Sequence, residues 1–495
     1  MTTMEESATP STPELPESDG VQNNCARGRA SAAGGERPVQ AWTAKRAALI
    51  TTGANLLMSV LGVFTGVVAA RLLGPKGRGE LAAIQAWPSA LAVLALLGTS
   101  EAVLYFCARE PRRRAEYLGA ALLIGTVGAL VFSLAGFFAM PWLLASQSPA
   151  IVWGARVFLF QIWLYLLISM PAEVLRAGGH FVAWNILRIC PMLVWVGIFV
   201  VAWLTGVRRA VPLASAYIAV GWLLLGPAIV LLRRNGFSLA RPRRIEVAET
   251  LKFGLPAVST FMPRMLNLRL DQILMAGLLP PAALGQYVVA VAWSGAGTPL
   301  IHGLSSVIVP KLAGRSGEGA AGSELLARAA RLGTLVAALL AFALMVLAPM
   351  GIPFFFGLRF GESIRAAKIL AIAGGVAGLN MVLSEGIRGM GRPASVLRAE
   401  LAALVVTAGG LWLLLRPLGI YGAALVSLIA YAVTTCWLLF EARMVTGFAI
   451  ADFLLPRVED FHFITGAVRE FAQIGLCAAD SVPKVLARAL RRGNS

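Results

Sequence analysis

The feature that most constrains this chain is a short phrase that occurs twice. Residues 71–83 read RLLGPKGRGELAA and residues 277–289 read GLLPPAALGQYVV, so that Leu73, Pro75 and Gly79 recur 206 residues later. Each copy stands between two long apolar runs, which predicts a tight loop joining two membrane helices. A membrane protein built from two related halves is a common transporter architecture, with the substrate path between the halves.

The composition is that of a membrane protein with many spans. Of the 495 residues, 58% are hydrophobic and 14% are charged, against about 25% charged residues in soluble globular proteins. A membrane-crossing helix needs about 20 apolar residues, and the chain holds roughly twelve such runs between residues 47 and 441. These runs lack the two-residue alternation of a membrane barrel. The sequence therefore predicts an all-α, polytopic membrane protein, with about 12 transmembrane helices in two parallel six-helix lobes around a central cavity.

The repeat also divides the chain. An offset of 206 residues corresponds to about six spans, an even number, so an axis along the membrane normal relates the two halves. A weaker echo pairs Arg176 with Arg388 and Gly179 with Gly391. The predicted parts are a disordered N-terminal tail (1–44), a first lobe (45–233), a cytoplasmic linker (234–246), a second lobe (247–445) and a cytoplasmic amphipathic tail (446–495).

The net charge of +18 has two interpretations. Arginine clusters follow the second, sixth and tenth predicted spans, so the positive-inside rule places those loops and both termini in the cytoplasm. Three cations of the first loop, Arg71, Lys76 and Arg78, do not fit that rule. The other interpretation is an anionic substrate. The five cysteines are scattered and no Walker loop occurs, so we expect no disulfide framework, metal site or bound cofactor, and no direct use of ATP.

The richest polar pattern lies in the seventh run. Thr260, Arg264, Asn267 and Asp271 follow the spacing i, i+4, i+7, i+11, which forms a single stripe on one continuous helix. Because a charge at the bilayer centre costs about 3 kcal/mol, such side chains face a cavity or one another. One interpretation is a cavity wall in which Arg264 attracts an anion. The other is an internal ion pair of Arg264 or Arg269 with Asp271.

Further polar residues inside the predicted spans complete the set of candidate substrate-binding residues. The set is Arg264, Asn267, Asp271, Arg156, Arg188, Glu101, Asn55 and His302. Helix packing is the alternative explanation for a small polar group such as Asn55, and an isolated His302 is more often a packing residue than a proton carrier. Gln161 and Asn380 could bind sugar hydroxyls, although isolated amides more often bond to a neighbouring helix. Sugar rings could stack on four aromatic residues, Trp163, Tyr165, Trp195 and Trp203, although the interfacial belt explains most of the tryptophans better. No nucleophile motif or paired catalytic carboxylates occur, so the sequence does not predict an enzyme.

At these residues the chain resembles a known family. RLLGPKGRGELA after the first span and LRLDQILMAGLLPPAALGQY across the seventh are similar to the oligosaccharide flippases of bacterial surface-polysaccharide synthesis, in the multidrug/oligosaccharidyl-lipid/polysaccharide exporter superfamily. The resemblance implies a protein of the bacterial inner membrane that moves an undecaprenyl-diphosphate-linked glycan to the periplasmic leaflet by alternating access. It implies the lipid bilayer, a polysaccharide polymerase and glycosyltransferases as partners, and no nucleic acid. The resemblance does not fix the energy source, for which a proton gradient and a sodium gradient both stay open.

On this hypothesis Arg264, with Arg156 or Arg188, holds the diphosphate. Three alternatives stay open. A multidrug exporter of cations would be expected to expose acidic groups, a lipid II flippase would be expected to have two additional spans, and a non-transporting membrane scaffold has no need of intramembrane charge in both halves.

Overall fold

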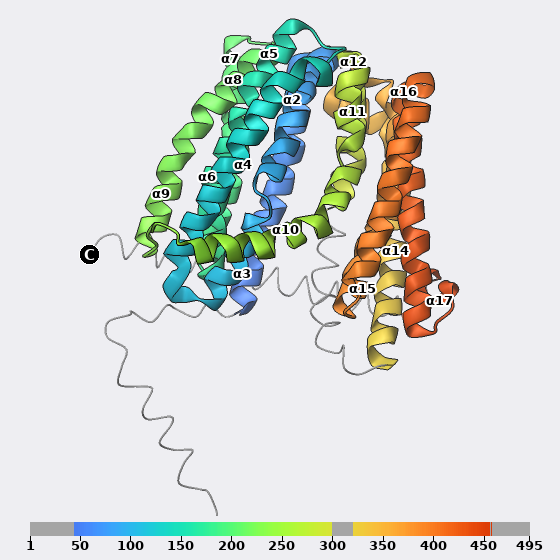
Figure 1. Cartoon of the computed structure of the whole chain (residues 1–495). Coiled ribbons are helices and arrows are strands. Elements are labelled where there is room, and N and C mark those ends of the chain that lie inside the picture. Colours follow the sequence, from blue (N-terminus) through green and yellow to red (C-terminus); the bar gives the residue numbers. More distant parts are fainter. Residues whose placement is uncertain (1–43, 299–319, 456, 458–495) are drawn as a thin grey trace, which may run out of the picture. The chain divides into compact units, whose positions relative to one another are not determined.

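The computed structural model describes residues 44–298, 320–455 and 457, and within these residues all regular structure is helical. The prediction of an all-helical fold is confirmed. His302 and most of both predicted tails lie outside the described residues. With the labels of Figure 1, the helices are α2 (Ala44–Ala95), α3 (Thr99–Arg109), α4 (Arg114–Leu143), α5 (Pro149–Phe158), α6 (Phe160–Ala177), α7 (Phe181–Thr205), α8 (Ala210–Gly221), α9 (Leu225–Arg234), α10 (Arg244–Asn267), α11 (Leu270–Leu278), α12 (Pro281–Ser294), α14 (Ala320–Phe356), α15 (Ser363–Gly389), α16 (Pro393–Thr446) and α17 (Ile450–Leu454).

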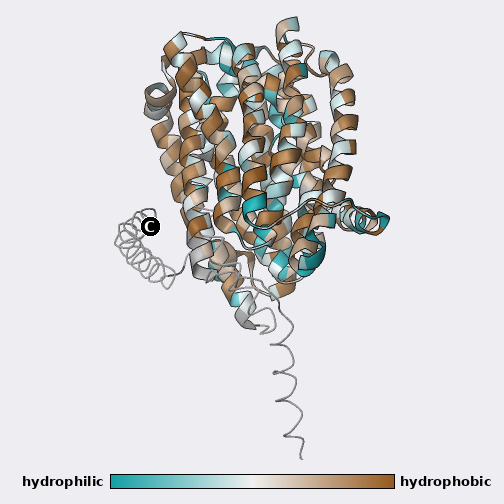
Figure 2. Ribbon diagram, turned by 90° about the vertical axis from the view of Figure 1, so that its left-hand side faces the viewer, coloured by the Kyte–Doolittle hydropathy of each residue, from teal (hydrophilic) through white to brown (hydrophobic). Residues whose placement is uncertain are grey.

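Most of these helices have the length and composition of membrane spans. Eight segments of the described residues are long and apolar enough to cross a membrane, and apolar residues cover most of the ribbon in Figure 2. Two of the segments, Ile50–Arg109 and Pro393–Thr446, have 60 and 54 residues, more than twice the roughly 20 that one crossing needs. Each contains a glycine outside helical geometry, Gly74 or Gly419, so each is long enough for two crossings. The count of about twelve spans stays a prediction.

The repeated phrase is mostly helix rather than loop. Within residues 71–83 only Gly74 leaves the helical conformation, with φ 65° and ψ −177°. Pro75 then lies in the first turn of the next helical stretch, where its missing N–H has no cost. In the second copy the break is at Leu279 and Pro280, before α12 begins at Pro281. The predicted tight loop is therefore wrong in its extent, because a glycine at positive φ makes the break with a single residue.

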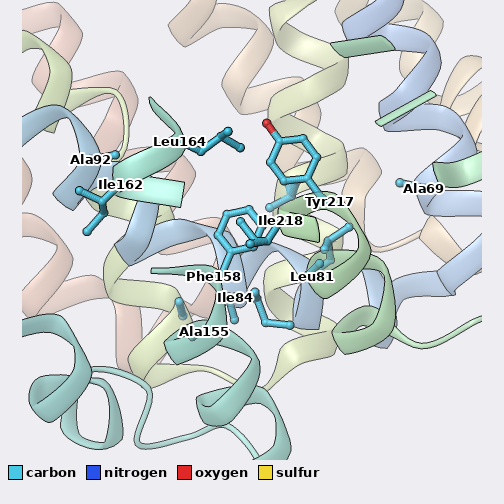
Figure 3. Close-up of a cluster of buried hydrophobic side chains, with 14 of the residues drawn as sticks. Ala69, Leu81, Ile84, Ala92, Ala155, Phe158, Ile162, Leu164, Tyr217 and Ile218 are labelled. Carbon is cyan, nitrogen blue, oxygen red and sulfur yellow. The ribbon is translucent and has the colours of Figure 1, made fainter. Parts of the chain in front are cut away.

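Close packing of apolar and small residues holds the first half of the chain together. Figure 3 shows Tyr217 of α8 beside Phe158 of α5, with ring centroids 5.8 Å apart. Leu81 and Ile84 of α2 belong to the same buried cluster. Small residues such as glycine let membrane helices approach closely. These contacts fix α2, α5 and α8 against one another and so determine the wall that α2 presents to the second half.

Helix α10 begins against the first half of the chain. A Cβ atom placed on Gly98 would stand 2.1 Å from the carbonyl oxygen of Gly254, so the backbones of α3 and α10 touch. Arg113 donates to Glu246 at 2.6 Å, and the Glu246 side chain is only 2% exposed. Figure 1 shows α10 lying across the ends of the neighbouring helices before the chain turns into α11.

The other end of α10 packs in the second half. Asn267, its last residue, donates to the carboxylate of Glu400 on α16 at 3.0 Å. Pro256 and Pro263 lie between the two ends, and a proline inside a helix removes one backbone hydrogen bond and favours bending. This single helix thus connects the two related halves.

Candidate substrate cavity

A cavity of about 370 Å³ lies where α2 and α6 of the first half face α10, α11 and α12 of the second. Its polar side chains are Arg78, Gln85, Ser89, Gln161, Tyr165, Arg269 and Gln272. Neither Asp nor Glu occurs among the described residues that line it. The cavity therefore offers positive charge and amide or hydroxyl groups, which suit a ligand that is both anionic and rich in hydrogen-bonding groups.

One wall of the cavity is a single face of α2. Arg78, Ala82, Gln85, Ser89 and Val93 line it, at the spacing i, i+4, i+7, i+11, i+15 that places side chains on one side of a helix. The Arg78 side chain forms no hydrogen bond or ion pair with a described residue. The sequence interpretation missed this face, because it assigned Arg78 to a loop and started the next span at residue 81. The helical spacing itself is the signal that would have found it.

Arg269 supplies the second cation, from the other half of the chain. It stands between α10 and α11 with φ −130° and ψ −18°, outside helical geometry. Its side chain interacts electrostatically with Asp271 but forms no hydrogen bond or ion pair with a described residue. The side chains of Arg78 and Arg269 therefore have no described carboxylate within ion-pair distance, and their N–H donors are available to an anionic ligand in the cavity.

The predicted polar stripe of the seventh run is interrupted. Helix α10 ends at Asn267 and α11 starts at Leu270, so Asp271 belongs to a second helix. Its carboxylate accepts hydrogen bonds from the Tyr287 hydroxyl and from the Gln272 amide. The prediction of one continuous stripe is wrong, because a carboxylate in the first turn of a helix is stabilised by that helix's own N-terminus. Arg264 lies 4.0 Å from Glu385 instead of pairing with Asp271.

Arg264 and Asn267 line a different and smaller cavity, of about 50 Å³, inside the second half. Asn380 and Glu400 line it as well. The Glu400 side chain accepts the hydrogen bond from Asn267 and forms no ion pair with a described residue. This cavity is polar, but unlike the larger one it contains an acid.

The remaining candidates lie apart from both cavities. Arg156 donates to the carbonyl oxygen of Phe137 at 2.9 Å and stands 4.5 Å from the centroid of that ring. Glu101 is exposed in the first turn of α3. Asn55 accepts a hydrogen bond of 3.0 Å from Arg188. The three arginines of the predicted diphosphate site thus lie in three separate places.

Beside the larger cavity the two copies of the repeated phrase touch. Gly79, which follows Arg78, lies where α2 crosses α12. A Cβ atom on Gly79 would stand 1.6 Å from the carbonyl oxygen of Pro281, and one on Gly285 would stand 1.9 Å from that of Pro75. The contact is reciprocal, which is the pattern that a twofold axis produces. Only a residue without a side chain permits it on either helix.

Comparison with known sequences identifies the family. The family model described as polysaccharide biosynthesis protein matches residues 44–314, which is more than half of the chain. The chain belongs to the polysaccharide biosynthesis protein family. No curated protein matches it.

Solved structures show which fold this family member has. The lipid II flippase MurJ in an inward closed conformation matches with a TM-score of 0.64 and 15% identity, over 82% of this chain and 89% of that one. An inward-facing multidrug resistance MATE family transporter of the MOP superfamily matches with a TM-score of 0.65 and 16% identity, over 80% and 99%. A MOP superfamily transporter from Pyrococcus furiosus, reported to have a binding pocket of reverse polarity, matches with a TM-score of 0.55 and 16% identity, over 81% and 96%. This polysaccharide biosynthesis protein is therefore a multi-pass membrane protein with the fold of flippases and transporters.

Proposed function

We propose that the protein is a flippase that moves undecaprenyl-diphosphate-linked sugar units from the cytoplasmic to the outer leaflet of the bacterial inner membrane by alternating access. The observation that carries this proposal is the 370 Å³ cavity, which presents one arginine from each half, Arg78 and Arg269, and no described acid. One guanidinium group can donate two parallel, charge-assisted hydrogen bonds to the oxygens of a phosphate. A diphosphate lying between the two halves would therefore contact both.

The size of the cavity supports a lipid whose head alone enters the protein. Pockets of roughly 300–1,000 Å³ enclose drug-sized groups, so 370 Å³ accommodates a diphosphate with part of a glycan but not a long polyprenyl tail. Moving one bare ion from water into a medium like hydrocarbon costs on the order of 20 kcal/mol, which the arginines would offset. An inside-negative potential favours outward movement of anionic charge by about 2.3 kcal/mol per charge per 100 mV.

The alternatives differ in what they require of this cavity. An exporter of cationic drugs needs acidic groups facing its substrate, and the described lining has none. A membrane scaffold has no need of a cavity lined by Arg78 and Arg269. A lipid II flippase would bind the same diphosphate group. The two functions therefore differ only in the glycan that the lipid carries.

A proton or sodium gradient would act most directly on a buried group that can change charge. Glu400 is 7% exposed, lines the 50 Å³ cavity and has an amide as its hydrogen-bond partner. We place gradient coupling at this carboxylate. Glu400→Gln should make transport independent of an imposed proton or sodium gradient while uncoupled exchange of substrate continues. An unchanged gradient dependence would remove Glu400 from this role.

The orientation and partners follow from the same proposal. Arg233 and Arg234 at the end of α9 and the arginines of the linker would face the cytoplasm, together with both termini. A flippase working in this direction takes its substrate from membrane-bound glycosyltransferases and delivers it to a polymerase on the other side.

The test is transport in proteoliposomes that contain a fluorescent polyprenyl-diphosphate-linked saccharide, measured by its accessibility to an impermeant quencher. Arg78→Ala and Arg269→Ala should each lower the initial rate by about 10- to 100-fold, since hydrogen bonds to charged groups contribute about 1.5–3 kcal/mol. Lys76→Ala is the matched control, because Lys76 is an exposed cation near Arg78 that does not line the cavity. Wild-type protein that moves lipid II equally well would favour the lipid II alternative. Equal rates for all variants would contradict the proposal.

A further inference from the structure

A group of polar residues in the first half of the chain has a counterpart in the second. Four positions have a counterpart 212 residues further on, and three of them keep the same residue. The pairs are Asn55 and Asn267, Glu173 and Glu385, Arg176 and Arg388, and Arg188 and Glu400. In both halves the glutamate pairs with the arginine three residues later, at 3.3 and 3.1 Å. In both halves the asparagine bonds at 3.0 Å to the fourth member, 133 residues away. The duplication thus extends to hydrogen bonds, and only the fourth position changes its charge.

Arg188 is the member whose charge differs. Its guanidinium donates to Oδ1 of Asn55 at 3.0 Å and to Oδ1 of Asn185 at 3.1 Å, and both acceptors are neutral amides. Asn185 is 4% exposed and held by its own bond to the carbonyl oxygen of Phe181, at 2.8 Å. Arg188 forms no ion pair with a described residue. A guanidinium has five N–H donors, so several remain for a ligand.

A tryptophan brings a second cation to the same place. The Cζ atoms of Arg188 and Arg176 stand 4.4 and 4.9 Å from the ring centroid of Trp184. Glu173 already pairs with Arg176. The group that we call the Arg188 cluster, formed by Asn55, Glu173, Arg176, Trp184, Asn185 and Arg188, therefore has two cations and one anion. Glu101, an exposed acid of α3, interacts electrostatically with Glu173. Within the Arg188 cluster the cations outnumber the single carboxylate, and the Arg188 guanidinium keeps unused N–H donors, so the ligand that suits it is an anion.

The position of the Arg188 cluster limits which anion can reach it. Arg176 lies in the last turn of α6, and Arg188 lies two turns into α7, about 10 Å along that helix. The connection between these helices is a predicted cytoplasmic loop. Phosphates of the cytoplasmic leaflet lie near such helix ends, and basic pockets between membrane helices on this side bind lipid head groups. No member of the cluster lines the 370 Å³ cavity.

We propose that the Arg188 cluster is a second anion site, which docks the phosphate or diphosphate of a lipid in the cytoplasmic leaflet before the head group enters the central cavity. The cytoplasmic location of the Arg188 cluster rests on the proposed function, but its ability to bind an anion does not. Phosphate oxygens would accept hydrogen bonds from the unused N–H groups of Arg188, while Asn55 and Asn185 hold the guanidinium in place. The second half cannot do this, because Glu400 would repel the same ligand.

The experiment measures equilibrium binding of radiolabelled farnesyl diphosphate to the full chain in phosphatidylcholine nanodiscs. The background is Arg78→Ala with Arg269→Ala, which removes the cations of the central cavity. Binding should persist in this background and weaken at least 10-fold when Arg188→Gln is added. Arg156→Gln is the matched control, because Arg156 is a half-buried cation of the same half that also stacks on an aromatic ring; it should leave the affinity unchanged.

Further arms identify the source of the phosphate and check folding. Competition by phosphatidylglycerol in the nanodisc would assign the Arg188 cluster to ordinary head groups, whereas selective binding of farnesyl diphosphate would assign it to polyprenyl diphosphates; both support the site. Arg188→Lys should bind with intermediate affinity and unfold at the wild-type temperature. Absence of binding in the double-alanine background overturns the docking site and leaves the proposed function intact. The proposed function fails separately, if Arg78→Ala and Arg269→Ala transport normally.

Discussion

Two of the contacts between the halves of the chain differ in their chemistry. At the repeated phrase, α2 and α12 cross with backbone against backbone at Gly79 and Gly285. At the start of α10, a glycine contact is combined with the ion pair of Arg113 and the buried Glu246. The first contact depends on shape alone, whereas the second also depends on charge. A transporter that alternates between two states must rearrange such contacts, and only the second can respond to pH or to charged ligands.

The largest effect is expected at the first contact. Gly79→Val places a side chain where a Cβ atom would stand 1.6 Å from the carbonyl oxygen of Pro281, so α2 and α12 must move apart. Transport in the proteoliposome assay should fall by at least tenfold. Gly66→Val is the control, because a Cβ atom on Gly66 meets nothing within 4 Å. Wild-type transport by the Gly79 variant would show that the crossing is not needed.

The glycine part of the second contact should have the next largest effect. Gly98→Ala combines a positive φ of 74° with a Cβ atom 2.1 Å from the carbonyl oxygen of Gly254. We expect a loss of about 1–3 kcal/mol, seen as a lower thermal unfolding temperature. Gly206→Ala separates the two causes, since Gly206 has a φ of 72° and no neighbour within 4 Å. An equal loss in both variants would mean that backbone strain alone matters.

The charged part of the second contact should have a smaller effect. Arg113→Ala removes the partner that lies 2.6 Å from Glu246, while the bond from the backbone amide of Arg243 remains. The unfolding temperature should fall by a few degrees. In Glu246→Gln protein the same Arg113 substitution should cost less, because the two residues are coupled. Additive effects in this double-mutant cycle would contradict the coupling.

The smallest effect is the dependence on pH. Burial by itself would raise the pKa of Glu246, but hydrogen bonds from Arg113 and from backbone amides hold the pKa below its usual range. The stabilisation is therefore fully present above the unfolded pKa, about 4.3, and is lost as the pH falls through the lower folded value. Thermal unfolding between pH 7 and pH 3.5 should show a shallower acid loss for Glu246→Gln than for the wild type. Identical slopes would mean that other groups cause the acid loss.

Much of the fold could be predicted from the sequence. The long apolar runs predict the helices, and the doubled phrase predicts two related halves, with its two copies interpreted as turns on the outer face. What the phrase could not indicate is that Gly79 and Gly285 lie against each other where the halves meet, since a repeat in the sequence does not report which residues are in contact. The predicted loop also hid Arg78, which a helix beginning at Pro75 turns towards the cavity.

The candidate site was predicted less completely. The rule that charged residues inside spans face a cavity selected Arg264 and Arg188, and both lie in polar clusters. It could not show that these clusters are equivalent places in two halves rather than one site. Arg269 entered the sequence interpretation only as an alternative partner for Asp271. Its place in the cavity follows from the break between α10 and α11, which the periodicity of the sequence does not predict. On the two sides of this break, Asn267 bonds to Glu400 and Asp271 bonds to Tyr287.

The reciprocal glycine contact has a consequence for ancestry. Each glycine faces the carbonyl oxygen of the proline at the start of the other copy, which is what two identical chains would do across a twofold axis. An ancestor of half the present length would have needed only one such glycine to join two subunits, and one substitution would have created or destroyed both contacts at once. After duplication the two positions became separate, but neither can gain a side chain alone. Relatives should therefore keep or lose this pair of glycines together.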